Sequence, residues 1–202
     1  NNFTSTDQNP TVSNSVTTEM AGVYNVTATV NGVTSSAGTT TVTVAAVPVL
    51  QGGGSSFCIG GSCILWATVT SGGTGTYNYQ WQYSADGSTN WANVSNGTPS
   101  GITYTGNTSQ EFMISGNGSE TAQTVYYKCI LTSTTEGSGC EAESPAMPVT
   151  IRPLPTISGV TINQVFVSAS SQQTTLTYIA STENPTRYAI TWDAAAIIAG
   201  FP

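Results

Sequence analysis

The sequence predicts an all-β fold. Charged residues make up only 6% of the 202 residues, and the chain contains no histidine. A chain so poor in lysine and glutamate does not favour helices. Threonine, serine, valine, glycine and asparagine dominate instead, and they favour strands joined by tight turns. Several short segments alternate apolar and polar residues, which supports the same prediction.

The first segment, residues 1–47, predicts the end of a β-sandwich. Gly22–Val30 has the composition of a strand, the Asn31-Gly32 pair is a strong tight-turn signal, and Thr39–Val44 alternates as a last strand. We expect this segment to supply the last three strands of a sandwich, with Tyr24 in its core.

The middle segment, residues 48–153, carries the outline of a complete immunoglobulin-like sandwich. Cys63 and Cys129 bracket Trp81, and Tyr127 stands two residues before the second cysteine. Proline-bearing linkers, Ala46–Val49 and Ile151–Pro155, flank a stretch of roughly 105 residues, which is the size of one sandwich domain. Such short linkers predict restricted angles between modules.

The strands expected within this segment are short and separated by turn signals at sandwich spacing. They are Cys63–Val69, Tyr77–Tyr83, Trp91–Val94, Ile102–Tyr104, Glu111–Ser115 and Val125–Leu131.

The four cysteines predict two disulfides. Alternation places Cys63, Leu65, Ala67 and Val69 on one face, and Tyr127, Cys129 and Leu131 on another inward face. We therefore expect a Cys63–Cys129 bridge between the sheets and, by elimination, a Cys58–Cys140 bridge. The alternative pairing, Cys58 with Cys63 and Cys129 with Cys140, closes two local loops and stays open.

The last segment, residues 154–202, predicts the start of a further sandwich. Thr174–Ala180 and Tyr188–Trp192 have strand character, and Trp192 takes a position analogous to the core residue Trp81. A short helix is expected over Asp193–Ala199, between a capping aspartate and Gly200. The fold class predicted is thus all-β, with tandem immunoglobulin-like modules of which one is complete and two are partial.

Charge excludes two classes of partner. The net charge is −7, and Lys128, Arg152 and Arg187 are the whole basic complement, so we expect neither nucleic-acid binding nor attraction to anionic membranes. No apolar run approaches the roughly 20 residues of a membrane span, and no membrane insertion is predicted.

No catalytic residue, cofactor or metal site is predicted. The chain has no histidine for a triad and no phosphate-binding glycine-lysine loop. Glu136, Glu141 and Glu143 gather near Cys140, but a calcium loop shows tighter Asp/Asn/Gly patterning. The sequence therefore indicates a protein that is not an enzyme.

Two tryptophans are candidates for ligand stacking. Trp66 shares the outward face of its strand with Ile64, so its ring can stack on a sugar or cover an inter-module contact. Trp91 is the second candidate platform, and the amides of Gln80 and Gln82 are candidate hydrogen-bonding groups for polysaccharide.

Three stretches of the chain resemble the repeated Ig-like and PKD-like modules of giant surface adhesins from gliding bacteria, of the SprB type. They are AGVYNVTATVNGVTSSAGTTTVTV, YNYQWQYSADGSTNWANVSNGTPSGITYTG and NPTRYAITWDAAAIIAGF. The resemblance covers nearly the whole chain, although Val33 lies where related modules often carry a cysteine. It implies export by the type IX secretion system, display on the outer cell surface, and partnership with the gliding machinery.

Together these features predict a disulfide-stabilised stalk segment of a secreted adhesin, which reaches an external surface or polysaccharide through its parent protein. The alternative is an accessory carbohydrate-binding module of a secreted multidomain hydrolase, with Trp66 or Trp91 as its platform.

Overall fold

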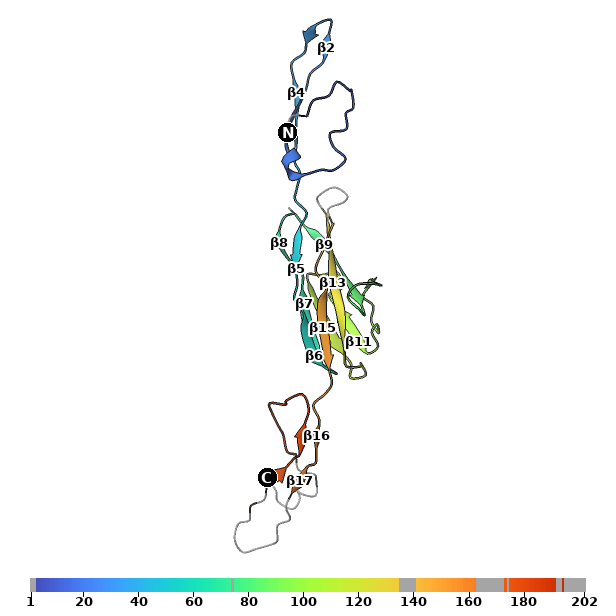
Figure 1. The fold of residues 1–202 in the computed structure, drawn as a ribbon, viewed down its shortest axis with the longest axis vertical. Coiled ribbons are helices and arrows are strands. Elements are labelled where there is room, and N and C mark those ends of the chain that lie inside the picture. Colours follow the sequence, from blue (N-terminus) through green and yellow to red (C-terminus); the bar gives the residue numbers. More distant parts are fainter. Residues whose placement is uncertain are drawn as a thin grey trace.

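The structure, a computed structural model, describes residues 3–73, 75–134, 141–162, 173, 175–191 and 194. Nearly all of its regular structure is β-strand; apart from Ala194, the described helical residues form one 3-10 turn, η1 (Thr18–Met20). Figure 1 shows a paired-strand segment, a two-layered sandwich and a second group of short strands following one another along the long axis. The predicted all-β fold class is confirmed.

The N-terminal segment is a long hairpin. Strand β1 (Gly22–Val26) pairs antiparallel with β4 (Gly38–Val42), and β2 (Thr29–Val30) pairs with β3 (Val33–Thr34) around the Asn31-Gly32 turn. Asn31 and Gly32 adopt φ values of 49° and 80°, as a tight hairpin turn requires. The first of the three expected strands is not formed among the described residues before β1, so that expectation is wrong.

One layer of the sandwich is a sheet in the order β10-β9-β13-β15-β6, with β14 also on β13. Its strands are β6 (Ser55–Cys58), β9 (Tyr77–Ser84), β10 (Ala92–Asn93), β13 (Gln123–Ser133), β14 (Glu141–Glu143) and β15 (Met147–Arg152). The β6–β15 pair is parallel, whereas the other pairs of this sheet are antiparallel.

The other layer contains β11-β12-β7 and the β5–β8 pair. Because β7 and β8 follow each other across Ala67, these two pieces continue one another along the chain. Their strands are β5 (Val49–Gln51), β7 (Ser62–Trp66), β8 (Thr68–Ser71), β11 (Ile102–Thr105) and β12 (Glu111–Gly116). This is the strand arrangement of an immunoglobulin-like sandwich, with the first strand divided between the layers.

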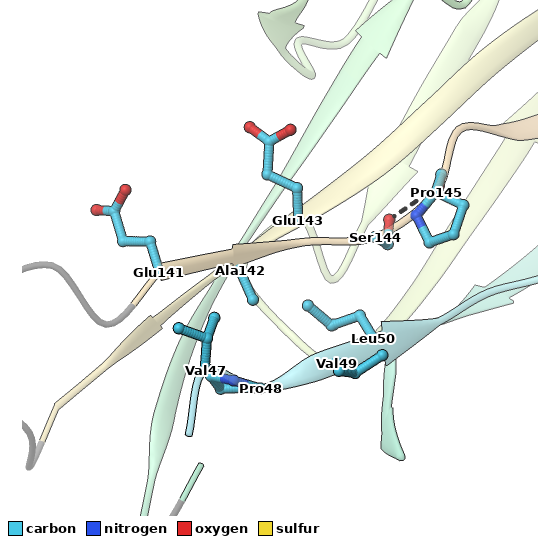
Figure 2. A pocket seen from close by; sticks show the side chains of 9 residues that line it. All are labelled: Val47, Pro48, Val49, Leu50, Glu141, Ala142, Glu143, Ser144 and Pro145. Atoms are coloured by element: carbon cyan, nitrogen blue, oxygen red, sulfur yellow. Dashed lines mark hydrogen bonds between the residues drawn. The ribbon is translucent and has the colours of Figure 1, made fainter. Parts of the chain in front are cut away.

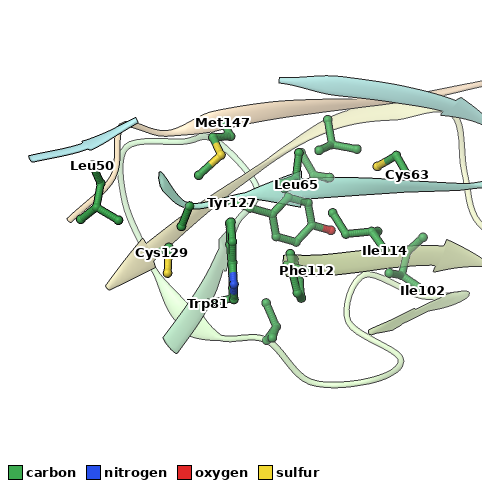
Figure 3. Close-up of a cluster of buried hydrophobic side chains, with 14 of the residues drawn as sticks. Leu50, Cys63, Leu65, Trp81, Ile102, Phe112, Ile114, Tyr127, Cys129 and Met147 are labelled. Carbon is green, nitrogen blue, oxygen red and sulfur yellow. The ribbon is translucent and has the colours of Figure 1, made fainter. Parts of the chain in front are cut away.

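The buried core lies between these layers (Figure 3). All of its buried hydrophobic residues fall between Leu50 and Ile151. Cys63, Leu65 and Ala67 point inward from one layer, and Tyr127, Cys129 and Leu131 point inward from the other, as alternation predicts. The division of the chain after residues 47 and 153 stays a prediction.

In the described part of the C-terminal segment, each strand is two residues long. Strand β16 (Ile157–Ser158) pairs with β19 (Ala180–Ser181), and β17 (Thr161–Ile162) pairs with β18 (Leu176–Thr177). Residues 188–191 form no strand, so the expected Tyr188–Trp192 strand is wrong over its described part. Trp192 and, apart from Ala194, the expected helix lie outside the described residues.

Candidate ligand-binding surface

Trp66 lies on the outer face of the sandwich. The burial of β7 alternates strictly, so Leu65 enters the core while Ile64 and Trp66 point to solvent. The Trp66 side chain is 51% exposed and that of Ile64 is 43% exposed. Across the ladder, Trp66 is paired with Glu111 and Ile64 with Met113. An aromatic platform of this kind is free to meet a ligand.

A shallow hollow of about 310 Å³ lies beside Trp66, lined also by Gln51, Gly52, Gly53 and Thr68. Gln51 ends β5 and is paired with Thr68 on β8, so the ladder fixes both side chains next to the ring. A Cβ placed on Gly53 would meet no atom within 4 Å. Among the described residues, neither the Gln51 amide nor the Thr68 hydroxyl has a hydrogen-bond partner in the protein.

Trp91 is less available than Trp66. It is half-buried, and the Lys128 ammonium lies 5.0 Å from its ring centroid. Lys128 is in turn held by Glu143, with Nζ and Oε2 2.9 Å apart. A cation over the ring occupies the face on which a sugar would stack. The structure therefore separates the two predicted platforms, one open and one covered.

The amides predicted to face polysaccharide are partly engaged within the protein. Gln80 Nε2 donates to the Trp81 carbonyl at 3.0 Å, and Gln82 Nε2 donates to Asn93 Oδ1 at 3.2 Å. Their donor groups thus hold β9 and β10 in place.

A second, wider hollow of about 650 Å³ lies between β5 and β14. Figure 2 shows the side chains of Val47 and Leu50 on one side, while the carboxylates of Glu141 and Glu143 point away from them. Ser144 also lines the hollow, but its hydroxyl already accepts from the Cys129 N–H and donates to the Pro145 carbonyl. The hollow therefore presents mainly apolar groups.

The predicted disulfides are not formed. Cys63 and Cys129 are both buried, but their thiols are free. Cys63 is paired with Ile114 and Cys129 with Trp81, and Figure 3 places the two sulfurs at opposite ends of the core with Tyr127 between them. Alternation correctly gave the face of each cysteine, but it does not fix position along the sandwich.

Cys58 is also a free thiol, exposed at the end of β6. Neither its predicted bridge to Cys140 nor the alternative bridge to Cys63 is therefore present, and Cys140 itself lies outside the described residues. Burial raises the pKa of the Cys63 thiol and raises the pKa of Cys129 to about 11. Both buried thiols are thus protonated and unreactive at neutral pH.

Two of the predicted core residues are central to the sandwich. Trp81 stacks on Phe112 with ring centroids 4.7 Å apart, and its Nε1 donates to the Ser109 carbonyl at 2.8 Å. The Tyr127 hydroxyl lies 3.1 Å from that of Tyr104. Burial raises the pKa of both phenols above their ordinary range.

Tyr24, the third predicted core residue, lies outside the buried core. It is half-buried on β1, and its hydroxyl donates to the Met20 carbonyl at 2.9 Å. A tyrosine hydroxyl bonded to backbone a few residues upstream is a feature of immunoglobulin-like corners. The fourth, Trp192, lies outside the described residues.

Two acidic side chains, Glu120 and Asp86, are held by hydrogen bonds within the protein. Glu120 is only 4% exposed. Burial raises its pKa, but backbone N–H groups, including those of Gly60 and Gly118, outweigh burial and hold the pKa below its usual value. Asp86 accepts hydrogen bonds from Thr89, Ser88 and Ser84 in a turn, which keep its pKa well below the ordinary range.

Within the described residues, no three His, Cys, Asp or Glu side chains gather as metal ligands would. Glu136, one of the three glutamates considered for calcium, lies outside those residues. No helix in the described part of the chain has the length and apolar character needed to cross a membrane.

Sequence reasoning singled out Trp66 but missed the groups around it. Gln51 and Thr68 come from two strands that meet only in the folded sheet, and Gly52 and Gly53 follow directly after Gln51. The one available signal was the Gly52-Gly53-Gly54 run, which marks backbone without side chains. No protein-family model matches the chain, and no curated protein is significantly similar to it.

Proposed function

We propose that the chain is a repeat segment of a secreted cell-surface adhesin, in which it forms part of an extended stalk. The observation that supports this most is the path of the chain through the sandwich. It enters at β5 and leaves after β15, and these points lie at opposite ends of the sandwich (Figure 1). Modules with ends placed in this way add length when joined in series.

The junctions support the same role. On the N-terminal side, the Gly73 N–H donates to the Ala46 carbonyl at 2.7 Å, and the Thr70 hydroxyl donates to the Val49 carbonyl at 3.1 Å. On the C-terminal side, the Ile59 N–H donates to the Arg152 carbonyl at 2.9 Å. These bonds fasten the chain to the sandwich at both ends, which suits a segment that transmits tension.

The more specific part of this proposal, which concerns export, location and gliding, rests on the resemblance to adhesin modules of the SprB type. It comprises export by the type IX secretion system, display outside the cell, and a contribution to surface adhesion and gliding. Free thiols in the sandwich core mean that packing and hydrogen bonds, rather than a disulfide, resist extension in this proposal.

Surface labelling tests the proposal. Fab fragments raised against the full 202-residue chain should label intact, unpermeabilised cells and reduce their attachment and gliding on glass. Labelling that requires permeabilisation would contradict the proposed location. Labelling of the surface without any effect on attachment or gliding would contradict the adhesive role.

The alternative, an accessory carbohydrate-binding module of a secreted hydrolase, is favoured by the open ring of Trp66. The two functions differ in what adjoins the chain in the parent protein. Further sandwich modules on both sides would favour the stalk, whereas a catalytic domain would favour the accessory module.

A further inference from the structure

We propose that the hollow beside Trp66 is a binding site for a neutral hexopyranose polysaccharide. The hollow is lined by an exposed indole, an amide, a hydroxyl and the backbone of two glycines. This inference goes beyond a stalk role, because it makes the segment itself adhesive, and it does not depend on that role.

The indole supplies the apolar part of sugar recognition. A pyranose ring presents a face of C–H groups, which packs on an aromatic face that other side chains leave open. Trp66 is 51% exposed, and Ile64 continues the apolar surface along the same face of β7. Two neighbouring side chains on one strand suit successive residues of a polymer better than a single small molecule.

The polar groups beside the ring supply the orienting part. The Gln51 amide both donates and accepts, and the Thr68 hydroxyl does the same. Neither has a hydrogen-bond partner among the described residues, so both are free for sugar hydroxyls. Gly53 carries no side chain, and a Cβ there would meet no atom within 4 Å, which leaves the approach to the ring open.

Charge selects a neutral sugar. Glu111 is paired with Trp66 across the ladder, and no basic residue lines the hollow. The chain as a whole carries a net charge of −7. A uronate or sulfated polymer would meet a negative potential at this face, whereas Glu111 can accept hydrogen bonds from neutral hydroxyls.

Calorimetric titration of the full chain tests the site. The probes are hexasaccharides of β-1,4-glucose, β-1,3-glucose, α-1,4-glucose, β-1,4-mannose and β-1,4-N-acetylglucosamine, with a galacturonate hexamer as the anionic comparison. We expect at least one neutral probe to bind and the galacturonate hexamer not to bind. Absence of binding by every neutral probe overturns the proposal.

Three variants at the hollow extend the test. Trp66→Ala should weaken binding of that probe by about tenfold or more, because the stacking platform is lost. Trp66→Phe should restore part of the affinity. Gly53→Leu keeps the tryptophan and adds a side chain at the rim, where a Cβ meets no atom within 4 Å, so it should also weaken binding.

Trp91→Ala is the matched control. Its ring is already covered by Lys128, so its removal should leave affinity within about twofold of the unmodified chain. Thermal unfolding of each variant confirms that the sandwich remains folded. Equal losses in Trp66→Ala and Trp91→Ala, or no loss in Trp66→Ala, would place binding elsewhere and overturn the assignment.

Discussion

Ser55 lies opposite Val149 in the parallel pair of β6 and β15. Ser55 begins β6, one of the first strands of the sandwich, whereas Val149 belongs to β15, its last strand. When the two ends of the sandwich are pulled apart, these parallel strands are drawn in opposite directions along their axes. The hydrogen bonds between them are then loaded together in shear rather than opened one by one.

This relationship predicts a difference between two adjacent proline substitutions. The Ile59 N–H donates to Arg152, so alternation along β6 points the Ser55 N–H toward β15 and the Ser56 N–H toward the open edge. Ser55→Pro should remove a ladder bond, cost about 1–3 kcal/mol in the free energy of unfolding, and lower the unfolding force. Ser56→Pro should leave the force near that of the unmodified chain.

Single-molecule pulling on the full chain through its two ends measures the force, and urea unfolding measures the free energy. Both substitutions introduce the same ring on the same strand, but Ser55→Pro also removes the hydroxyl that hydrogen-bonds to the Cys63 thiol, so Ser55→Ala measures that contribution separately. An equal fall in force for the two variants would show that the β6–β15 ladder does not bear the load.

The thiols should differ sharply in reactivity. Cys58 is exposed, whereas Cys63 and Cys129 are buried, and burial raises the pKa of Cys129 to about 11. In the folded chain at pH 8, a maleimide should modify Cys58 quickly and leave Cys63 and Cys129 unmodified. Both should react once the chain is unfolded in urea without reductant.

Peptide mapping by mass spectrometry under non-reducing conditions assigns each modified cysteine. A linked peptide containing Cys63 and Cys129, still unmodified after unfolding, would mean that the two thiols are bridged in solution. That result would contradict the free thiols of the structure and restore the bridge expected from sequence.

The two buried cysteines show which parts of the fold the sequence could predict and which it could not. Alternation has a period of two, so it correctly assigned Cys63 and Cys129 to inward faces. Which inward residues meet across the sandwich depends on strand stagger and tilt, which a single sequence does not encode locally. The same limit hid the hollow at Trp66, because Gln51 and Thr68 become neighbours only through the pairing of β5 with β8.

Residues 188–191 illustrate a different limit. Tyr188, Ile190 and Thr191 have high β-propensity, but a strand also requires a partner. Among the described residues, the C-terminal segment offers only two-residue ladders. Propensity alone therefore predicted a strand that the structure does not form.

Glu120 should make the stability of the sandwich depend on pH. Its buried carboxylate accepts hydrogen bonds from the N–H groups of Gly60 and Gly118, the latter at 2.8 Å. Because the folded pKa lies below the ordinary value of 4.5, its contribution is present above pH 4.5 and is lost as pH falls through the folded pKa. Glu120→Gln should cost about 1–3 kcal/mol at pH 7, since an amide NH₂ group replaces one of the two accepting oxygens and cannot accept its bond.

Urea unfolding at pH 7, 5, 4 and 3 provides the measurement. The difference between the unmodified chain and Glu120→Gln should shrink toward pH 3. Glu111→Gln, at an exposed glutamate on β12, is the control and should change stability little. A Glu120→Gln difference that stays constant over this range would show that the charge on Glu120 is not what stabilises the fold.

The Tyr104 and Tyr127 hydroxyls should contribute unequally. The Tyr104 hydroxyl donates its proton to the Thr98 carbonyl at 2.7 Å. In the contact between the two hydroxyls at 3.1 Å, Tyr127 is therefore the donor and Tyr104 the acceptor. Tyr127→Phe removes only the second bond and should cost about 1 kcal/mol. Tyr104→Phe removes both bonds and leaves the fully buried Tyr127 hydroxyl without its partner, so it should cost about 2–3 kcal/mol.

Urea unfolding of the two single variants and the double variant provides the measurement. The double variant should cost less than the sum of the single ones, because Tyr127→Phe removes the hydroxyl that Tyr104→Phe leaves without a partner. Equal costs for the two single variants would show that the Thr98 bond adds nothing to the pair.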